Sequence, residues 1–353
     1  MLNILTIDVE DYFQVHAFSR VIRYEDWGNY ECRIERNVDR ILAILNEATQ
    51  NSNFKTQNLK EVNSLTHDLN NSLTQKVHGT FFVLGWLAER YPDLIRRIKD
   101  EGHEIACHGY AHKLIYHQSK EEFREDIRRA KGILEDIIGS EVIGYRAPSY
   151  SITNKSRWAF EVLIEEGFKY DSSIFPIHHD FYGFPSAPRF PFIISLNGDS
   201  NFEFSMLNFE SEENKNSKLE MNNLLTHSLI NQMSNNSSLI TQKLKFIIEF
   251  PLSTVRFVNM NLPISGGGYF RLLPYRVIEL GLMRTNRKER KPFIFYFHPW
   301  ELDMNQPRIK TASPLSKFRH YVNLGRTEDR LKRLLREFAF STVKEVLGVD
   351  DNH

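Results

Sequence analysis

The chain lacks the features that would place it among disulfide-rich, nucleic-acid-binding or membrane-spanning proteins. Its 353 residues include two cysteines, Cys32 and Cys107, which form no CxxC pair and no disulfide framework. The formal net charge is +0, with 45 Lys and Arg against 45 Asp and Glu, so no excess of positive charge indicates a nucleic acid or an anionic membrane as partner. No apolar run approaches the roughly 20 residues of a membrane-spanning helix, so we expect no transmembrane segment.

The amino terminus shows no leader-like pattern. Met1 is followed at once by residues 2–7, which include only a few apolar residues and no basic region, and Asp8 is the first acid. Such a segment is too short for the apolar region of a signal peptide and is typical of a first core strand. We therefore expect a cytoplasmic protein.

What the chain does contain is an alternation of strand-like and helix-like segments. Apolar runs predict strands at 3–8, 80–84, 103–107, 142–146, 246–250 and 293–297. Helical spacing or helix caps lie between them at about 38–48, 92–102, 119–139 and 155–167. Repeated βα units predict an α/β fold with a mostly parallel sheet, and the near-continuous apolar strands favour a sheet covered on both faces.

Three segments depart from this alternation. Residues 49–76 and about 197–243 are polar and weakly periodic, so they cannot bury enough apolar surface to offset the entropy of ordering them. We interpret both as surface insertions. Residues 327–347 carry leucines at helical spacing and precede Gly348, which predicts one amphipathic helix docked on the domain.

Polar residues that could carry chemistry follow the predicted strands, where α/β enzymes build their active sites. His108 and His112 are four residues apart, which would place them on one face of a helical turn and close enough to bind one metal ion. Taken alone, the pair fits a solvated or hydrogen-bonded role equally well.

Three acids, Asp8, Glu10 and Asp11, directly follow the first predicted strand. Alternation along a strand puts Asp8 and Glu10 on one face, and Asp11 could join them if the strand has already ended. A helix cap with solvated charge is the structural alternative.

Arg146 and His298 stand at two further strand ends. Pro148 holds Ala147 extended and gives a rigid loop that would present Arg146 and the N–H groups after it. His298 can titrate near neutral pH as a general acid. A surface ion pair and a structural hydrogen bond are the alternatives for these two residues.

Together these residue types fit metal-assisted amide hydrolysis. One carboxylate and two imidazoles, with a water in the remaining position, make an open catalytic metal site. Mixed nitrogen and oxygen ligands suit Zn²⁺, with Co²⁺ or Ni²⁺ as substitutes. A second carboxylate could then act as the base and a separate histidine as the acid.

Ordered motifs run from residue 6 to about 340, interrupted only by the two polar segments. They include TIDVEDYFQVHAF, GTFFVLGWLAERYPDLIRRIKDEGHEIACHGYAH, GYRAPSYSI, YDSSIFPIHHDFYGFPSAPRFP, LPISGGGYFRLLPY, FYFHPWELD and RHYVNLGRTEDRL. In these motifs the sequence resembles the polysaccharide deacetylase (NodB-homology) family, and closely the subfamily associated with exosortase/PEP-CTERM exopolysaccharide loci.

The resemblance implies a distorted (β/α)7-type barrel that binds a divalent metal. It implies a hydrolase that removes acetyl groups from N-acetylated sugars of an oligo- or polysaccharide during exopolysaccharide synthesis, in association with the assembly machinery. The expected organisation is one domain, residues 1–353, with a core of about 3–300 and a carboxyl-terminal family extension of about 301–348.

Roles carry over motif by motif. Asp8 matches the catalytic base, Arg146 the arginine that orients it, and His298 the catalytic acid. Ser149 falls where a backbone N–H helps to hold the oxyanion. Asp171 could pair with His298, or it could cap its strand.

The metal ligands carry over with one departure. His108 and His112 match the family's metal-binding histidines, whereas Val9 occupies the place of the second of two adjacent acids. The metal carboxylate is therefore Glu10 or Asp11, and strand alternation favours Glu10.

Further departures concern the pocket. Gly109 replaces the usual Ser or Thr, and Tyr296 replaces a Leu that lines the acetyl pocket. The triple glycine 266–268 predicts a tight turn beside the substrate groove, without the helix start of a phosphate loop. Aromatic residues near the groove, namely Trp300, Tyr269 and Phe270, weakly favour sugar stacking.

Two other functions remain open from the sequence. The chain could be a metal-dependent amidohydrolase that acts on a non-sugar amide, or an inactive carbohydrate-binding member of an assembly complex. Retention of the base, the histidines, the arginine and the acid argues against the second.

Overall fold

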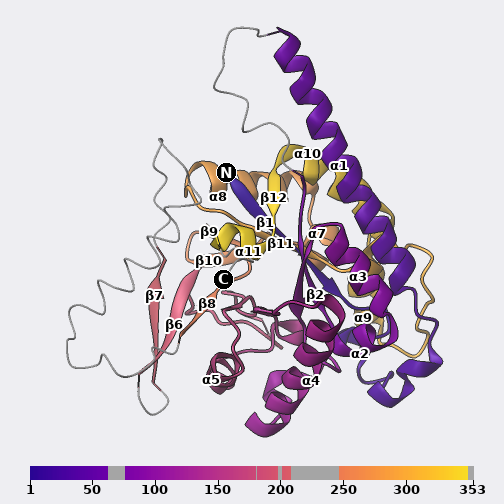
Figure 1. The fold of residues 1–353 in the computed structure, drawn as a ribbon, viewed down its shortest axis with the longest axis vertical. Helices are drawn as coiled ribbons and strands as arrows, with labels where there is room; N and C mark the ends of the chain where they lie inside the picture. The colour runs from indigo at the N-terminus through magenta and orange to yellow at the C-terminus, as the bar shows by residue number, and fades with distance from the viewer. Residues whose placement is uncertain (63–75, 180, 198–200, 208–245, 349–353) are drawn as a thin grey trace.

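The computed structural model describes residues 1–62, 76–179, 181–197, 201–207 and 246–348. Within them, a curved parallel sheet forms the centre of the molecule, and helices pack around it (Figure 1). Apolar side chains from the strands and from the inner faces of the helices make the main core. No helix in these residues is both long enough and apolar enough to cross a bilayer.

Seven strands, each parallel to its neighbours within the series, form the continuous central part of a 10-stranded sheet in the described residues. Their order is β11 (Ile294–Phe297), β1 (Leu2–Val9), β2 (Thr80–Val83), β3 (Glu104–Cys107), β4 (Gly144–Tyr145), β5 (Tyr170–Asp171) and β8 (Phe246–Glu249). A short strand, β12 (Ala339–Ser341), also pairs parallel to β1. The predicted α/β class with a mostly parallel sheet is confirmed.

The space between β8 and β11, the two ends of this series, is bridged by the segment that follows β8. Ile294 N–H donates to Ser253 Oγ (2.8 Å), and Ile264 N–H donates to the Ser253 carbonyl (3.3 Å). Tyr296 N–H donates to the Ser265 carbonyl (2.7 Å). The sheet therefore curls round on itself in the manner of a distorted barrel.

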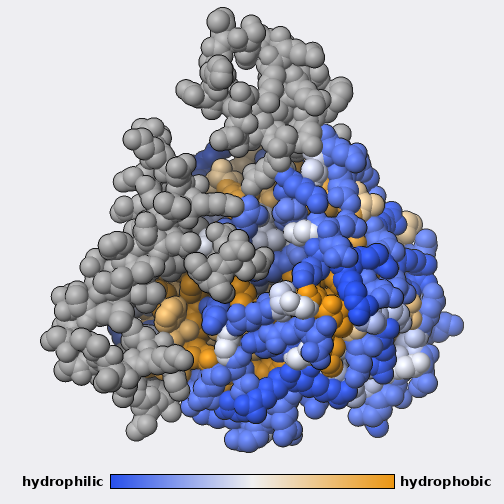
Figure 2. Space-filling view, in the orientation of Figure 1, coloured by the Kyte–Doolittle hydropathy of each residue, from blue (hydrophilic) through white to orange (hydrophobic). Residues whose placement is uncertain are grey.

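Two antiparallel hairpins extend this framework. One consists of β6 (Phe192–Asn197) and β7 (Asn201–Met206), and the other of β9 (Thr254–Phe257) and β10 (Met260–Pro263). On the face seen in Figure 2, polar side chains cover α4 (Lys120–Ile138), and apolar side chains reach the surface beside β6 and β8.

The helices follow the sequence pattern closely where caps are present. The others are α1 (Ile34–Val62), α2 (Gly85–Arg90), α3 (Pro92–Asp100), α5 (Trp158–Glu165), α7 (Gly267–Leu272), α8 (Tyr275–Arg287), α9 (Pro314–Tyr321), α10 (Thr327–Glu337) and α11 (Val343–Leu347). Short 3-10 turns cover 16–18, 24–29, 115–117, 148–150, 299–302 and 324–326. Helix α4 begins at the predicted capping box, in which Ser119 and Glu122 accept each other's N–H, and it ends at Gly139 with φ 64°.

Two expectations about the irregular segments need correction. Residues 49–62, predicted as part of a surface insertion, continue α1, because this stretch has no Gly or Pro to stop a helix that has already formed. Residues 201–206 form β7, in which Phe202 and Phe204 alternate and pack against the core. Residues 63–75 and 208–245, the rest of both predicted insertions, lie outside the described residues.

The carboxyl-terminal segment is likewise not one helix. Helix α10 ends at Glu337, β12 pairs with β1, and α11 starts after Thr342, whose side chain accepts the N–H of Glu345 (3.0 Å). The aromatic residues Phe338 and Phe340 favour extended backbone, and pairing with the central strand outweighs continuation of the helix.

Candidate active site

The sequence-predicted residues converge because their strands are neighbours and run in parallel. Asp8 lies in β1 and Glu10 just after it, while His108 follows β3, Arg146 follows β4 and His298 follows β11. The register aligns Ile7 with Phe297 and Cys107 with Tyr145, so the residues after each pair emerge at the same edge. All five are therefore brought to the carboxyl end of the sheet.

Glu10, His108 and His112 form one cluster that could hold a metal ion. One ligand atom from each lies within 4.8 Å of the others. His112 Nε2 lies 2.9 Å from Glu10 Oε2, yet this buried oxygen has no hydrogen bond of acceptable geometry in the described residues. A buried carboxylate oxygen without a donor, facing two imidazoles, fits a cation at their common point.

The hydrogen bond between His108 and the Arg146 carbonyl determines which ring nitrogen is free to bind a metal. Its Nδ1 lies 2.8 Å from the Arg146 carbonyl, which can only accept, so Nδ1 carries the proton and Nε2 keeps its lone pair. This is the arrangement by which proteins orient metal-binding histidines. Burial lowers the pKa of His108 to about 4, although the charge of Asp8 acts to raise it. The ring is therefore neutral at neutral pH and able to bind a metal.

The two histidines do not lie on a helical turn as predicted. Residues 108–112 form a bend in which Gly109 has φ 74° and His112 has φ 53°. A Cβ at position 109 would lie 2.8 Å from Asp126 Oδ2, which accepts the N–H of Tyr110 (2.8 Å). The glycine is thus required by a close approach, and a bend rather than a helix brings the rings together.

Asp11, the alternative metal carboxylate, points elsewhere. Its two oxygens accept the N–H of Tyr12 (2.8 Å) and of Arg33 (2.5 Å). Burial nevertheless raises the pKa of this carboxyl to about 6. The geometry therefore places Glu10, and not Asp11, with the two histidines.

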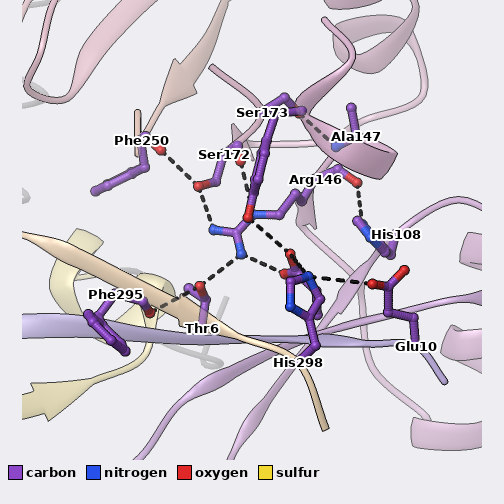
Figure 3. A network of polar contacts seen from close by, with 12 residues as sticks. Thr6, Glu10, His108, Arg146, Ala147, Ser172, Ser173, Phe250, Phe295 and His298 are labelled. Atoms are coloured by element: carbon purple, nitrogen blue, oxygen red, sulfur yellow. Dashed lines mark hydrogen bonds and ion pairs between the residues drawn. The ribbon is translucent and has the colours of Figure 1, made fainter. Parts of the chain in front are cut away.

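Asp8 and Arg146 form a buried ion pair beside the cluster. Figure 3 shows Arg146 among Thr6, Ser172 and His298. Arg146 is 0% exposed, and its Nη1 donates to Asp8 Oδ1 (2.6 Å) and Thr6 Oγ1 (2.8 Å). Its Nη2 and Nε donate to the hydroxyl and the carbonyl of Ser172 (2.8 and 3.0 Å). Burial opposes ionisation of Asp8, but the guanidinium and nearby imidazoles outweigh it and lower the pKa of the carboxyl.

His298 points into the same space from β11. Its Nε2 lies 3.5 Å from Glu10 Oε1 and 3.8 Å from Asp8 Oδ2. Its Nδ1 lies 2.5 Å from Glu301 Oε1, and the other oxygen of Glu301 accepts a bond from Arg271 Nε (2.7 Å). Burial lowers the pKa of His298, but the bond to Glu301 and the charge of Glu10 dominate and raise it to about 9, so the imidazole is protonated at neutral pH.

The suggested pairing of Asp171 with His298 is not present. Asp171 accepts the hydroxyl (2.6 Å) and the N–H (3.2 Å) of Ser173 and shares a hydrogen bond with Glu249. The Ser173 hydroxyl oxygen in turn accepts the N–H of Ala147 (2.7 Å), so Asp171 supports the loop after Arg146. The cause is the sheet order, since four strands separate β5 from β11 on the path through β1.

Ser149 lies in that same loop. Ser149 and Tyr150 both adopt positive φ (51° and 54°), and the Tyr150 hydroxyl donates to Asp8 Oδ2 (3.3 Å). Such backbone is costly for non-glycine residues and is concentrated in functional sites. Asp8 thus has two fixed partners, Arg146 and Tyr150.

Several site residues escaped the sequence reasoning. Glu301 stands three residues after His298. In a 3-10 turn this spacing brings the carboxylate close to the residue that caps the turn, here His298, so the spacing alone could have predicted the contact. Arg271 and Tyr150 offered no local signal. Trp300 Nε1 donates to Glu10 Oε1 (3.3 Å) while the ring is 5% exposed.

Two pocket expectations therefore change. Trp300 and Phe270 are buried, at 5% and 1% exposure, and cannot stack on a sugar, whereas Tyr269 is half-buried. The glycine turn exists, but α7 begins at Gly267, contrary to expectation. Gly266 has φ 129°, and a Cβ there would lie 1.8 Å from the carbonyl oxygen of Tyr296, so the turn is shaped by close passage over β11.

Comparisons with known sequences agree with this site. Residues 63–163 match the family described as polysaccharide deacetylase, and residues 225–348 match a domain of unknown function, DUF3473. The first range contains His108, His112, Arg146 and Ser149, and the second contains His298.

Individual relatives are deacetylases. The chain is 31% identical over 111 residues to the peptidoglycan deacetylase of Helicobacter pylori, covering 31% of this chain and 36% of that one. It is 36% identical over 86 residues to a peptidoglycan-N-acetylglucosamine deacetylase of Bacillus cereus, covering 24% and 31%. The chain thus spans about a third of the length of these curated relatives.

A solved structure extends the likeness to the whole fold. The structure of a candidate polysaccharide deacetylase from Mycobacterium smegmatis aligns over 98% of this chain and 89% of that chain, with a TM-score of 0.50 and 17% identity. At that identity the likeness concerns the fold. Residues 63–163 are thus similar in sequence to polysaccharide deacetylases, and the described chain shares the fold of the solved structure.

Proposed function

We propose that this chain is a metal-dependent N-deacetylase that removes acetyl groups from N-acetylated sugar residues. The observation that carries the proposal is a three-ligand cluster, Glu10, His108 and His112, flanked by an ionised carboxylate on Asp8 and a protonated imidazole on His298. Metal-assisted amide hydrolysis requires these elements together. The match of residues 63–163 and the names of the deacetylase relatives support the reaction class.

Glu10 and the two imidazoles are the residues that would hold the metal, and Trp300 fixes the other oxygen of Glu10. A divalent ion bound there, Zn²⁺ in our proposal with Co²⁺ or Ni²⁺ as substitutes, would supply Lewis acidity to a water and to the acetamide carbonyl. The neutral, oriented His108 suits such a ligand role.

Asp8 is the proposed base. It takes a proton from the attacking water, whose oxygen forms the new bond to the acetyl carbon. Arg146 holds one carboxylate oxygen and Tyr150 the other, so the base is ionised and aimed before substrate arrives. Asp8 lies 3.8 Å from His298, which keeps the base and the acid adjacent.

His298 is the proposed acid. It delivers its Nε2 proton to the sugar nitrogen as the carbon–nitrogen bond breaks, because an amine is too basic to leave as an anion. The backbone N–H of Ser149 would donate to the developing oxyanion, a contribution of about 3 kcal/mol in comparable sites. The products are acetate and a free amino sugar.

The natural substrate we propose is an N-acetylated polysaccharide or its biosynthetic intermediate, in exopolysaccharide synthesis and in association with its assembly machinery. The motif resemblance that continues to about residue 340 supports this finer assignment. We also propose that the chain works as one deacetylase domain. The cytoplasmic location stays a prediction.

Acetate release tests the reaction. The purified chain, loaded with Zn²⁺ or Co²⁺, is expected to release acetate from N-acetylglucosamine oligosaccharides and to lose this activity with a chelator or with His108→Ala. His117→Ala, at an exposed histidine nearby, is the matched control and should retain activity. Activity that survives both chelation and His108→Ala would contradict the metal mechanism.

The alternatives have distinct outcomes. Turnover of non-sugar amides in a substrate panel, without turnover of the oligosaccharides, would favour the broader amidohydrolase. Oligosaccharide binding to metal-loaded protein without acetate release would favour an inactive carbohydrate-binding protein.

A further inference from the structure

The β9–β10 hairpin carries an apolar face that becomes more exposed toward its tip. Its register pairs Phe257 with Met260 and Val255 with Leu262, so these four side chains share one face. Val255 is half-buried and packs against the core, whereas Leu262 is 38%, Phe257 61% and Met260 62% exposed. Among the described residues, contacts with the rest of the protein cover the base of this face and leave its tip exposed.

The turn continues the trend. Val258 is 78% exposed and has φ 52°, an unfavourable conformation for a β-branched residue. Folding gains nothing from an exposed valine in strained backbone. Together with Phe257 and Met260 it forms what we call the apolar tip.

Helix α8 lies beside the hairpin (Figure 1) and carries positive charge at its carboxyl end. Along one stripe of α8, exposed Val277 and Leu280 are followed by exposed Arg284 and Arg287. Exposed cations continue just beyond it. We call Arg284, Arg287, Lys288 and Arg290 the basic cluster.

A partly buried tether holds the two features together. Arg189 donates to Thr254 Oγ1 (3.1 Å) at the start of β9 and pairs with Glu289 (3.0 Å), which sits inside the basic cluster. The four residues Thr254–Phe257 lead from this tether to the turn, roughly 13 Å at the usual rise per residue. The apolar tip and the basic cluster therefore lie on neighbouring parts of the surface.

We infer that the apolar tip and the basic cluster form a docking surface for an anionic lipid bilayer. Apolar side chains that enter the headgroup boundary, next to cations that meet lipid phosphates, are the combination by which proteins lie on such membranes. The net charge of the whole chain is zero and gave no sign of an anionic membrane partner, because acids elsewhere in the sequence balance the cations of this cluster. This surface is separate from the residues of the candidate active site.

Charge favours lipid over other occupants. A symmetric contact with a second copy would bring two basic clusters close together and make them repel. A nucleic acid would use the cations but would leave the apolar tip exposed to water. An anionic bilayer satisfies both features at once.

The position of α8 places this surface away from the site. Asn286, near the carboxyl end of α8, donates to Asn3 Oδ1 (2.7 Å) at the start of β1, whereas the site lies beyond the carboxyl end of that strand. A bilayer docked at the basic cluster therefore leaves the candidate site uncovered.

Vesicle sedimentation of the full chain tests the surface. We expect the chain to sediment with vesicles of equal parts phosphatidylglycerol and phosphatidylcholine, weakly with phosphatidylcholine alone, and less at high salt. Arg287→Glu with Lys288→Glu should weaken binding at least 25-fold, from about fivefold per cation. Phe257→Ser with Val258→Ser should weaken it by about tenfold or more.

Matched controls lie elsewhere on the surface. Leu315→Ser with Phe318→Ser removes two exposed apolar side chains of α9, and Lys155→Glu with Lys169→Glu reverses two exposed cations. Both should bind vesicles like the wild type, and thermal unfolding should show that every variant is folded.

Three outcomes would overturn the inference. They are no sedimentation of the wild type with anionic vesicles, controls that lose binding as much as the test variants, and wild-type binding by the tip variant. A tip variant that instead turns a dimer into a monomer would identify a second copy as the occupant. RNA binding that depends on the basic cluster, with no vesicle binding, would identify nucleic acid.

Discussion

Two pairs of buried acids lie at the same end of the sheet and behave in opposite ways. Asp8 and Glu10 are 2% and 4% exposed, and Asp171 and Glu249 are both 0% exposed. Burial favours the neutral form of all four, yet the pKa of the first pair is lowered, to about 2 for Glu10, while the pKa of the second pair is raised. Burial alone therefore does not identify a functional carboxylate.

The difference lies in the partners. Asp8 faces Arg146, and Glu10 faces His112 and His298, so each loss of hydration is offset by positive charge. Glu249 has Asp171 as its main electrostatic partner, and a second acid adds to the effect of burial. The first pair is thus prepared for proton transfer and metal binding, and the second for hydrogen bonds that hold backbone in place.

Removing the cation from the first pair should have the largest effect. Arg146→Met leaves Asp8 buried beside unpaired hydrogen-bond acceptors, and we expect a loss of about 3–5 kcal/mol in the free energy of unfolding. Denaturant unfolding measures it. Arg128→Met, at a 63% exposed side chain paired with Glu166, is the control and should cost about 1 kcal/mol or less. Equal losses would contradict the comparison.

Neutralising the acid that faces the histidines should abolish metal binding. Glu10→Gln is expected to weaken Zn²⁺ affinity by more than about 100-fold, since residues that only orient ligands are worth roughly 10–100-fold. Asp11→Asn should leave the affinity near that of the wild type, because Asp11 holds backbone N–H groups instead. Calorimetric titration measures both, and the reverse order would make Asp11 the ligand.

Glu301 extends the comparison to the acid side of the site. Glu301→Gln should lower kcat by roughly 10–100-fold with little change in KM, because it removes the partner that orients and charges His298. The pKa of His298, about 9, should fall. Since the acid must be protonated, activity should then be lost at lower pH than in the wild type. An unmoved alkaline limb would contradict this role.

The smallest loss is expected for the acid whose pKa is raised. Glu249→Gln replaces the carboxyl with an amide of the same shape, so at neutral pH it should lower the free energy of unfolding by no more than about 1 kcal/mol. Chemical unfolding at a series of pH values measures it. A loss as large as that of Arg146→Met would mean that Glu249 is ionised.

The pH series also tests the direction in which the stability difference between the variant and the wild type changes with pH. A raised folded-state pKa stabilises the protein fully below the ordinary glutamate value, and this stabilisation is lost as pH rises through the folded value. Glu249→Gln lacks that loss, so its stability relative to the wild type should improve as pH rises.

Residue patterns predicted the strand ends and most of the site. Alternation along β1 favoured Glu10 over Asp11, and the structure places Glu10 with the histidines. Asp8, His108, Arg146 and His298 could be found because each directly follows or ends an apolar strand. Parallel neighbours then bring such positions together without further information.

Partners from distant segments could not be found this way. The sequence suggested Asp171 as the partner of His298, but the sheet order separates these two residues. The partner in the structure is Glu301, which is itself held by Arg271. Average polarity hid the alternation of Phe202 and Phe204 in β7. In each case the deciding contact is between elements, and local propensity does not contain it.

Strand β1 has a consequence for how the chain matures. Its neighbours β11 and β12 lie far along the chain, and they reach it only after residues 294–297 and 339–341 have been synthesised. The strand of Asp8 is therefore enclosed only once β11 has been made, and His298 arrives with β11. Until then a ribosome-bound chain has an open central strand, so catalytic competence and protection from aggregation are gained together.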